Sequence, residues 1–285
     1  MKFADPKSDI AFKKIFENES KKEILISFLN AVLDLKGEKE IKEVRILDPH
    51  QPPVIKDMKG TIVDVKVKDA RGITFIVEMQ VEASPFFDRR LLYYASHAYV
   101  SQIGAGEDYP RLNQVIFIGI LDFEMFEGDD YLTRHLILNT KTLKQEIKDM
   151  EFNFIELPKF DKKENDLKTI TDKWIYFLKN ADNLKIIPKT LESTEEIVEA
   201  FEIANRHEWT SGENAQYLRW ELKLGEDKIK LEEAKKKGYE EGMEKGMEQG
   251  VKDTARKMLS ENISIDNIIK CTGLTEECIK SLKNE

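Results

Sequence analysis

The spacing of apolar residues predicts an alternation of helices and strands over the first part of the chain. Residues 8–33 and 86–103 place apolar side chains at helical spacing. Between and after them lie short alternating or continuous apolar runs, which are typical of strands, at 41–47, 115–121, 131–138 and 152–157. This order of elements favours a mixed sheet flanked by helices, and therefore an α/β fold.

A β-hairpin is the most informative element of this pattern. Residues 62–68 and 74–80 are rich in β-branched and aromatic residues, and the intervening Asp-Ala-Arg-Gly has turn chemistry. Folding the ribbon about Arg71 predicts four opposed pairs: Lys68 with Thr74, Lys66 with Ile76, Asp64 with Glu78, and Ile62 with Gln80. Opposed residues project from the same face, with Cβ atoms about 4.5–5.5 Å apart. We therefore expect Asp64 and Glu78 to form an acidic pair.

Two carboxylates held this close repel each other unless a proton, a basic neighbour or a metal ion compensates their charge. Mg²⁺ binds one or two carboxylates together with waters and phosphate oxygens, which suits a site that cleaves phosphodiester bonds. The alternative is a solvated hairpin face on which Lys66 and Lys68 neutralise Asp64 and Glu78. The spacing alone leaves both interpretations open.

Beyond residue 158 the pattern is helical only. We expect a domain at 1–158, a helical extension at 159–224, a charged helix at 225–258 and a small helical hairpin at 259–285. Glycine recurs at every fourth position of the charged helix, at Gly238, Gly242, Gly246 and Gly250. Each glycine inside a helix costs about 1 kcal/mol relative to alanine. Two interpretations account for this glycine ladder. The helix makes close contact with another helix, across a homo-oligomer, or it is frayed.

Composition and charge narrow the class of protein. The 285 residues are 41% hydrophobic and 35% charged, and no apolar run approaches the roughly 20 residues that cross a bilayer. The first residues lack the apolar core of a signal peptide, so we expect a cytoplasmic protein that has no membrane partner. The net charge is −9, yet residues 1–110 are nearly balanced, with 17 basic and 18 acidic residues. The acidity therefore lies mainly away from the hairpin.

Basic residues near the hairpin either line a groove that faces phosphates or belong to a solvated surface. They are Lys7, Lys13, Lys14, Lys56, Lys59, Lys66, Lys68, Arg89 and Arg90. The two cysteines, Cys271 and Cys278, have no second Cys or His pair nearby, which argues against a zinc site.

Several segments match a known family in their order and spacing. They are DIAFKKIF at 9–16, IVDVKV at 62–67, VEMQ at 77–80, RLLYY at 90–94, GEDY at 106–109, ELPKF at 156–160, WIYFL at 174–178 and the glycine ladder. With these segments the chain resembles the recombination-promoting nuclease (Rpn)/putative transposase family, whose catalytic domain belongs to the PD-(D/E)XK nuclease superfamily. The resemblance implies a restriction-endonuclease-like α/β domain followed by an all-helical C-terminal region.

The resemblance also implies an activity, a DNA endonuclease that depends on Mg²⁺ or Mn²⁺ and is linked to recombination or mobile elements. Asp64 would bridge the metal and the scissile phosphate, while Glu78 and the carbonyl of Met79 would complete the metal ligands. Gln80 stands where the superfamily usually carries lysine, and Lys66 is a candidate to replace that cation. The expected reaction is metal-assisted in-line hydrolysis by water.

Two pairs at helical spacing complete the expected site. Asp9 and Lys13 are expected to reach the active site from the first helix, or else to form an ion pair on its surface. Arg90 and Tyr94, on the helix after the hairpin, are expected to contact substrate, although core packing also explains Tyr94. Because of Gln80, a catalytically weak or inactive DNA-binding or oligomerising module is the alternative function. A transposase that joins strands is a third.

Overall fold

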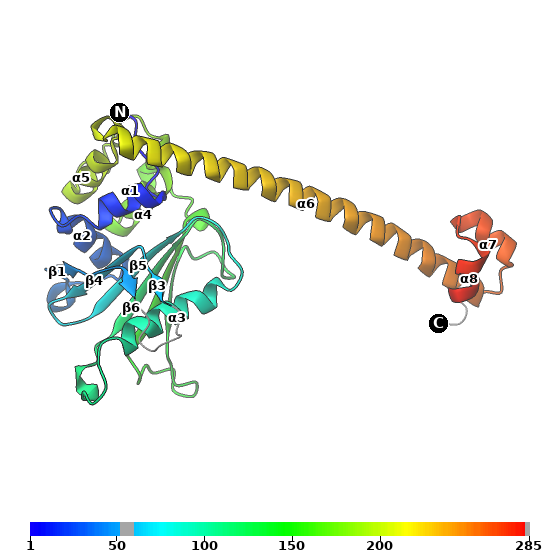
Figure 1. Ribbon diagram of the computed structural model, residues 1–285, viewed down its shortest axis with the longest axis horizontal. Helices are drawn as coiled ribbons and strands as arrows, with labels where there is room; N and C mark the ends of the chain where they lie inside the picture. The colour runs from blue at the N-terminus through cyan, green and yellow to red at the C-terminus, as the bar shows by residue number, and fades with distance from the viewer. Residues whose placement is uncertain (52–59, 283–285) are drawn as a thin grey trace. The chain divides into compact units, whose positions relative to one another are not determined.

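The computed structural model describes residues 1–51 and 60–282, so the expected basic residues Lys56 and Lys59 lie outside the described residues. The chain divides into two compact units, residues 1–218 and residues 219–285. Each unit is described by itself below (Figure 1).

The first unit is built on a six-stranded mixed sheet, as predicted. Its strand order is β1 (Val44–Ile46), β4 (Val65–Asp69), β5 (Thr74–Gln80), β6 (Val115–Leu121), β8 (Met150–Glu156) and β7 (Leu132–Leu136). The neighbours β5, β6 and β8 run parallel, and the other neighbouring pairs are antiparallel. Strand β6 is buried along its whole length, as its continuous apolar run predicted.

The hairpin of β4 and β5 has the predicted register. Lys66 lies opposite Ile76, and Lys68 lies opposite Thr74. The turn is fixed by Asp69, whose Oδ1 accepts hydrogen bonds from the backbone N–H groups of Arg71 and Ile73 at 2.9 and 3.0 Å.

The predicted pairing of Ile62 with Gln80 is wrong. Ile62 belongs to β3 (Thr61–Ile62), which pairs with β2 (His50–Gln51) in a separate two-stranded sheet. Gln80 instead lies opposite Leu121 of β6. A bend at Asp64 separates β3 from β4, so the ladder with β5 begins at Val65, three residues after the predicted start of this arm at residue 62.

Helices cover both faces of the sheet (Figure 1). The α-helices of the first unit are α1 (Asp9–Phe16), α2 (Lys22–Val32), α3 (Phe87–Val100), α4 (Ile170–Asn180) and α5 (Glu195–Ala204). The 3-10 helices are η1 (Gly37–Lys39), η2 (Tyr109–Arg111), η3 (Leu157–Lys159), η4 (Glu164–Asp166), η5 (Ala181–Asn183) and η6 (Arg206–Glu208). Helix α3 lies on one side of the sheet, and α1, α2, α4 and α5 lie on the other.

The single helix predicted at 8–33 is wrong, because the structure forms two helices there. Between them, the side chain of Asn18 accepts a hydrogen bond from the backbone N–H of Ser20 at 3.0 Å, and the carbonyl of Asn18 accepts one from Lys21 at 3.1 Å. Asn and Ser compete in this way with the helical hydrogen-bond pattern. The helical spacing of apolar residues continues across the break, so the sequence pattern did not indicate that the helix is interrupted.

Each face has its own apolar core. On the α3 side, Ile76 and Phe117 of the sheet pack with Leu91 and Ala95 of α3. On the other side, Phe16 of α1, Phe28 of α2 and Trp174 of α4 form an aromatic cluster with ring centroids 5.0 to 6.0 Å apart. The helical segment 159–218 is therefore part of the first compact unit, and the boundary expected at 158 does not separate two units.

The second unit contains most of α6 (Ser211–Ser260), together with α7 (Ile265–Thr272) and α8 (Glu276–Leu282). The predicted C-terminal helical hairpin is present. It packs against the end of α6 through a small core that includes Ala255, Ile268 and Ile279. Gly273, at φ +71°, ends α7 in the left-handed conformation that favours glycine.

Candidate active site

Asp64 and Glu78 lie side by side where β4 begins and β5 approaches its end. The backbone N–H of Asp64 donates to Oε2 of Glu78 at 3.1 Å. The backbone N–H of Met79 donates in turn to Oδ2 of Asp64 at 2.8 Å. Each carboxylate is thus hydrogen-bonded to the backbone at or beside the other, which holds both on the same side of the sheet.

Burial makes this acidic pair, Asp64 and Glu78, electrostatically unfavourable. The Glu78 residue is only 8% exposed. Burial raises the pKa of Asp64 to about 6, although the Met79 N–H opposes the shift. Burial, followed by the negative charge of Asp64, raises the pKa of Glu78 to about 8. Near neutral pH the two groups therefore share a proton instead of both carrying full charge.

No basic side chain among the described residues forms an ion pair with Asp64 or Glu78. Lys13 and Arg90 act from farther away, and their positive charges lower the pKa of both carboxyls. The alternative in which Lys66 and Lys68 neutralise the pair is not what the structure shows. The negative charge of the acidic pair is therefore only partly compensated, and binding of a cation there would be electrostatically favourable.

The residues of the pair fit a hard divalent cation. Two carboxylates with a neighbouring backbone carbonyl, that of Met79, match the oxygen ligands that Mg²⁺ prefers, with waters in its other positions. Within residues 1–51 and 60–282, no group of three or more His, Cys, Asp or Glu side chains is arranged to hold a metal. A cation at this site would therefore rest on two acidic side chains.

Gln80 joins the sheet to α3 beside the acidic pair. Nη2 of Arg90 donates a hydrogen bond to Oε1 of Gln80. The amide Nε2 of Gln80 donates to the carbonyl of Glu82 at 2.8 Å, which orients the amide with its oxygen toward Arg90. The guanidinium of Arg90 also lies over the ring of Phe87, 5.0 Å from its centroid. Arg90 is consequently held in place from two sides.

Tyr94 lies one helical turn beyond Arg90, close enough to the acidic pair for the negative charge of the pair to affect the pKa of its phenol. Burial raises the pKa of Tyr94, and the charges of Glu78 and Asp64 add to the increase. The phenol therefore stays protonated and can donate a hydrogen bond. The structure thus brings Arg90 and Tyr94 together with Asp64 and Glu78.

Asp9 and Lys13 of α1 approach the pair from the opposite helical layer. The negative charge of Asp9 raises the pKa of Asp64, and the positive charge of Lys13 lowers it. Within the described part of the chain, Asp9 and Lys13 do not form an ion pair with each other. The alternative in which they only pair on the helix surface is therefore not what the structure shows.

Lys66 is not brought together with the acidic pair. Its ammonium donates to Oε1 of Gln51 at 3.4 Å, on the two-stranded sheet. Burial and the neighbouring charge of Lys68 lower the pKa of Lys66, and Asp48 partly opposes this. Sequence spacing placed Lys66 on the right face but could not show where its long side chain extends.

The other basic residues of the expected groove have different roles. Lys7 pairs with Asp5 at 3.2 Å, and Lys14 pairs with Glu213. Arg89 lies over the exposed ring of Phe86, 5.1 Å from its centroid. Among the described members of this group, Lys13 and Arg90 are the ones whose charges are found to lower the pKa of both acids.

Sequence reasoning missed two contributors to the site. Phe87 supports Arg90, and Gly119 lies directly opposite Glu78 on β6. A Cβ atom at Gly119 would lie 2.8 Å from the ring of Phe154, so any larger residue there would force that ring to shift. The isolated glycine in an otherwise apolar strand was the available signal, because such a glycine marks a close approach.

A comparison with protein families matches residues 6–234 to the PD-(D/E)XK nuclease family transposases. No curated protein and no solved structure matches the chain. None of the described helices is long and apolar enough to span a membrane. The matched region includes the whole six-stranded sheet and both helical layers, and it agrees with the resemblance and the fold predicted from the sequence. The chain belongs to the PD-(D/E)XK nuclease family transposases.

Proposed function

We propose that this protein is a DNA endonuclease that hydrolyses phosphodiester bonds with the help of Mg²⁺ or Mn²⁺. The observation that carries the proposal is the buried acidic pair of Asp64 and Glu78, whose charge no ion pair within the described residues compensates. Membership of a nuclease family supports the same activity. We also propose that the protein acts in the cytoplasm, on recombining or mobile DNA.

In this proposal Asp64, Glu78 and the Met79 carbonyl hold the cation. The bound cation supplies Lewis-acid chemistry, polarising the phosphate and lowering the pKa of a water molecule. Because it also favours the ionised carboxylates, both side chains would give up their shared proton on loading.

The surrounding residues of this chain would handle the phosphate. Lys13 and Arg90 direct positive charge at the acidic pair, and the same charge attracts a phosphodiester. Tyr94 retains its proton and can donate to a phosphate oxygen. The amide of Gln80, itself held by the carbonyl of Glu82, orients the guanidinium of Arg90. Gln80 is therefore a positioning residue and not a source of charge.

The test is nicking of supercoiled plasmid by the full chain with Mg²⁺ and with EDTA. We expect cleavage with Mg²⁺ by the wild type and its loss in Asp64→Asn and Glu78→Gln. Asp108→Asn, an exposed acid in the loop after α3, is the matched control and should cleave normally. Cleavage that survives EDTA and both site variants would reject the proposal, and strand-transfer products beside the nicks would indicate a transposase.

The alternative function is a nuclease fold that binds DNA without cutting it. The specific observation in its favour is Gln80, an uncharged residue at the position where the superfamily usually has lysine. It predicts salt-sensitive DNA binding by folded protein, with no nicking under any divalent cation.

We further propose that the protein forms a homo-oligomer through α6. The glycine ladder has no atoms within 4 Å of the positions that its Cβ atoms would occupy. Beside it, Tyr239, Met243 and Met247 form a second exposed stripe at the same four-residue spacing. A stripe of glycines next to a stripe of large apolar side chains suits close packing against a second copy of α6.

A further inference from the structure

A cavity lies within the first unit, on the face of the sheet opposite to that of Glu78. Its volume is about 420 Å³, and its lining includes the buried Phe75 of β5 and Ile116 of β6, which lie side by side in the parallel register. Phe75 and Glu78 are three residues apart on one strand, so their side chains project to opposite faces. The cavity is therefore distinct from the candidate active site.

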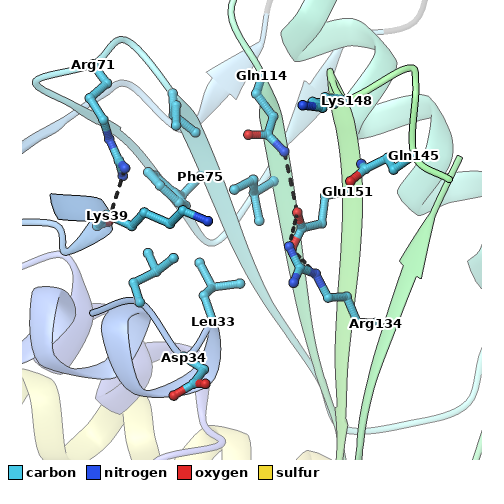
Figure 2. A pocket seen from close by; sticks show the side chains of 13 residues that line it. Leu33, Asp34, Lys39, Arg71, Phe75, Gln114, Arg134, Gln145, Lys148 and Glu151 are labelled. Carbon is cyan, nitrogen blue, oxygen red and sulfur yellow. Dashed lines mark hydrogen bonds and ion pairs between the residues drawn. The ribbon is translucent and has the colours of Figure 1, made fainter. Parts of the chain in front are cut away.

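Basic side chains surround this cavity from several elements (Figure 2). Lys39 comes from η1, Arg71 from the β4–β5 turn, Arg134 from β7, and Lys148 from the segment before β8. In Figure 2, Lys39 and Lys148 extend into the opening from opposite walls. The acidic residues that line it are Asp34 and Glu151.

The two arginines are already balanced and fixed in position. Arg134 pairs with the buried Glu151, with Nε 2.8 Å from Oε1 and Nη2 2.8 Å from Oε2. Arg71 pairs with Asp69 at 2.7 Å and donates from Nη1 to the carbonyl of Lys39 at 3.1 Å. Because these acids hold both guanidinium groups, the arginines present a rigid polar wall.

The two lysines are not balanced. Among the described residues, neither Lys39 nor Lys148 forms an ion pair, while Asp34 pairs with Lys36 outside the cavity at 2.7 Å. The cavity therefore keeps two uncompensated positive charges. Gln145 adds a further donor, because its buried Nε2 has no hydrogen-bond partner in the described part of the chain.

We propose that this cavity binds a phosphate monoester that carries a flat or apolar group, of which a mononucleotide is the simplest example. Two free ammonium groups match the charge of a phosphate dianion, and Gln145 supplies an additional hydrogen bond. The half-buried apolar side chains of Leu33, Leu35 and Ile73 accommodate the attached group. The volume falls within the range of small-molecule sites.

Two sources offer this chemistry, a free mononucleotide and the 5′-phosphorylated end of a DNA strand. The experiment is calorimetric titration of the full chain with AMP, with adenosine, and with a short oligonucleotide bearing either a 5′-phosphate or a 5′-hydroxyl. EDTA is present throughout, so that no metal can recruit phosphate to Asp64 and Glu78.

The site variant combines Lys39→Gln with Lys148→Gln. The matched control combines Lys42→Gln with Lys141→Gln, which changes the net charge equally and alters exposed lysines outside this cavity. Thermal unfolding confirms that both variants are folded. We expect AMP to bind the wild type and the control alike, and the site variant to bind at least about tenfold more weakly. Adenosine should also bind at least about tenfold more weakly than AMP.

Equal affinity of AMP for the two variants, or equal affinity of the wild type for AMP and adenosine, would overturn the proposal. So would the absence of saturable binding by both AMP and the phosphorylated oligonucleotide. A preference for the 5′-phosphorylated strand that AMP abolishes by competition identifies the strand end as the source. Binding of AMP without that preference identifies the free nucleotide. Neither result depends on nuclease activity, so this test and the plasmid test succeed or fail separately.

Discussion

Arg90 donates a hydrogen bond to Gln80, and this contact joins helix α3 to the end of strand β5 beside the acidic pair. The opposite end of the Gln80 amide is fixed by the carbonyl of Glu82. Gln80 thus carries no charge itself but positions a neighbouring cation. The site has a fixed positive charge in spite of Gln80.

Replacing Arg90 by alanine should shift the pH dependence of DNA cleavage. Its charge lowers the pKa of both Asp64 and Glu78, so its removal raises both values and delays their ionisation. We expect the acidic limb of the cleavage rate to move up by about 0.5 to 1 pH unit, together with a lower maximal rate. Single-turnover nicking measured against pH checks this.

Two further variants make that test specific. Arg90→Lys keeps the charge, so its acidic limb should stay near that of the wild type even if the rate falls. Arg89→Ala removes an adjacent cation that lies over Phe86, and should leave the limb unchanged. If Arg90→Ala lowers the rate without moving the limb, the guanidinium has no electrostatic effect on the pair.

The acidic pair should make the protein less stable at higher pH. The pKa of Asp64 rises from 3.8 to about 6 and that of Glu78 from 4.5 to about 8, so the folded state binds protons that the unfolded chain has released. The free energy of unfolding therefore falls as pH rises through this window. We expect Glu78→Gln to be more stable than the wild type at pH 8 by about 1 to 3 kcal/mol in EDTA.

Chemical denaturation at pH 5 and pH 8 measures this difference, with the exposed Glu82→Gln as control. Mg²⁺ should narrow this difference, since it stabilises the wild type by about 1.4 kcal/mol at ten times its dissociation constant and should barely affect Glu78→Gln. An identical response of both proteins to Mg²⁺ would mean that Glu78 does not hold the cation.

The hairpin was predictable because its information is local. Alternating apolar residues and the Asp69 turn define the register of Lys66 with Ile76, and that register places Asp64 beside Glu78. The path of the chain beyond the end of the β4–β5 ladder depends on distant elements. For this reason the predicted pairing of Ile62 with Gln80 was wrong.

Contacts between distant elements were not predictable. Nothing in the sequence near Gln80 or Arg90 shows that the two side chains meet, because α3 must first pack on the sheet. The direction of the Lys66 side chain toward Gln51 depends in the same way on the separate two-stranded sheet. The proposed phosphate cavity combines residues from five separate segments, so no sequence motif marks it.

Gly119 should be intolerant of even one added methyl group. Its Cβ would lie 2.8 Å from the Phe154 ring, within a fully buried strand. Overpacking of this kind costs about 1 to 3 kcal/mol, so Gly119→Ala should lower the free energy of unfolding by that amount. In Gly225→Ala, the same substitution meets open space on α6 and should stabilise its helix. Chemical denaturation of both variants checks the contrast, which would fail if they changed stability alike.

Bulky substitutions in the glycine ladder should separate the copies of the proposed oligomer. Gly242→Leu combined with Gly246→Leu keeps α6 helical, because leucine is a stronger helix former than glycine, but prevents the close approach of a second backbone. We expect the wild type to sediment as an oligomer and the double variant to shift at least about tenfold toward monomer in analytical ultracentrifugation. Gly225→Leu, on the same helix but outside the ladder, should sediment as the wild type does. A monomeric wild type, or a double variant that associates equally well, would show that the glycines make no helix contact.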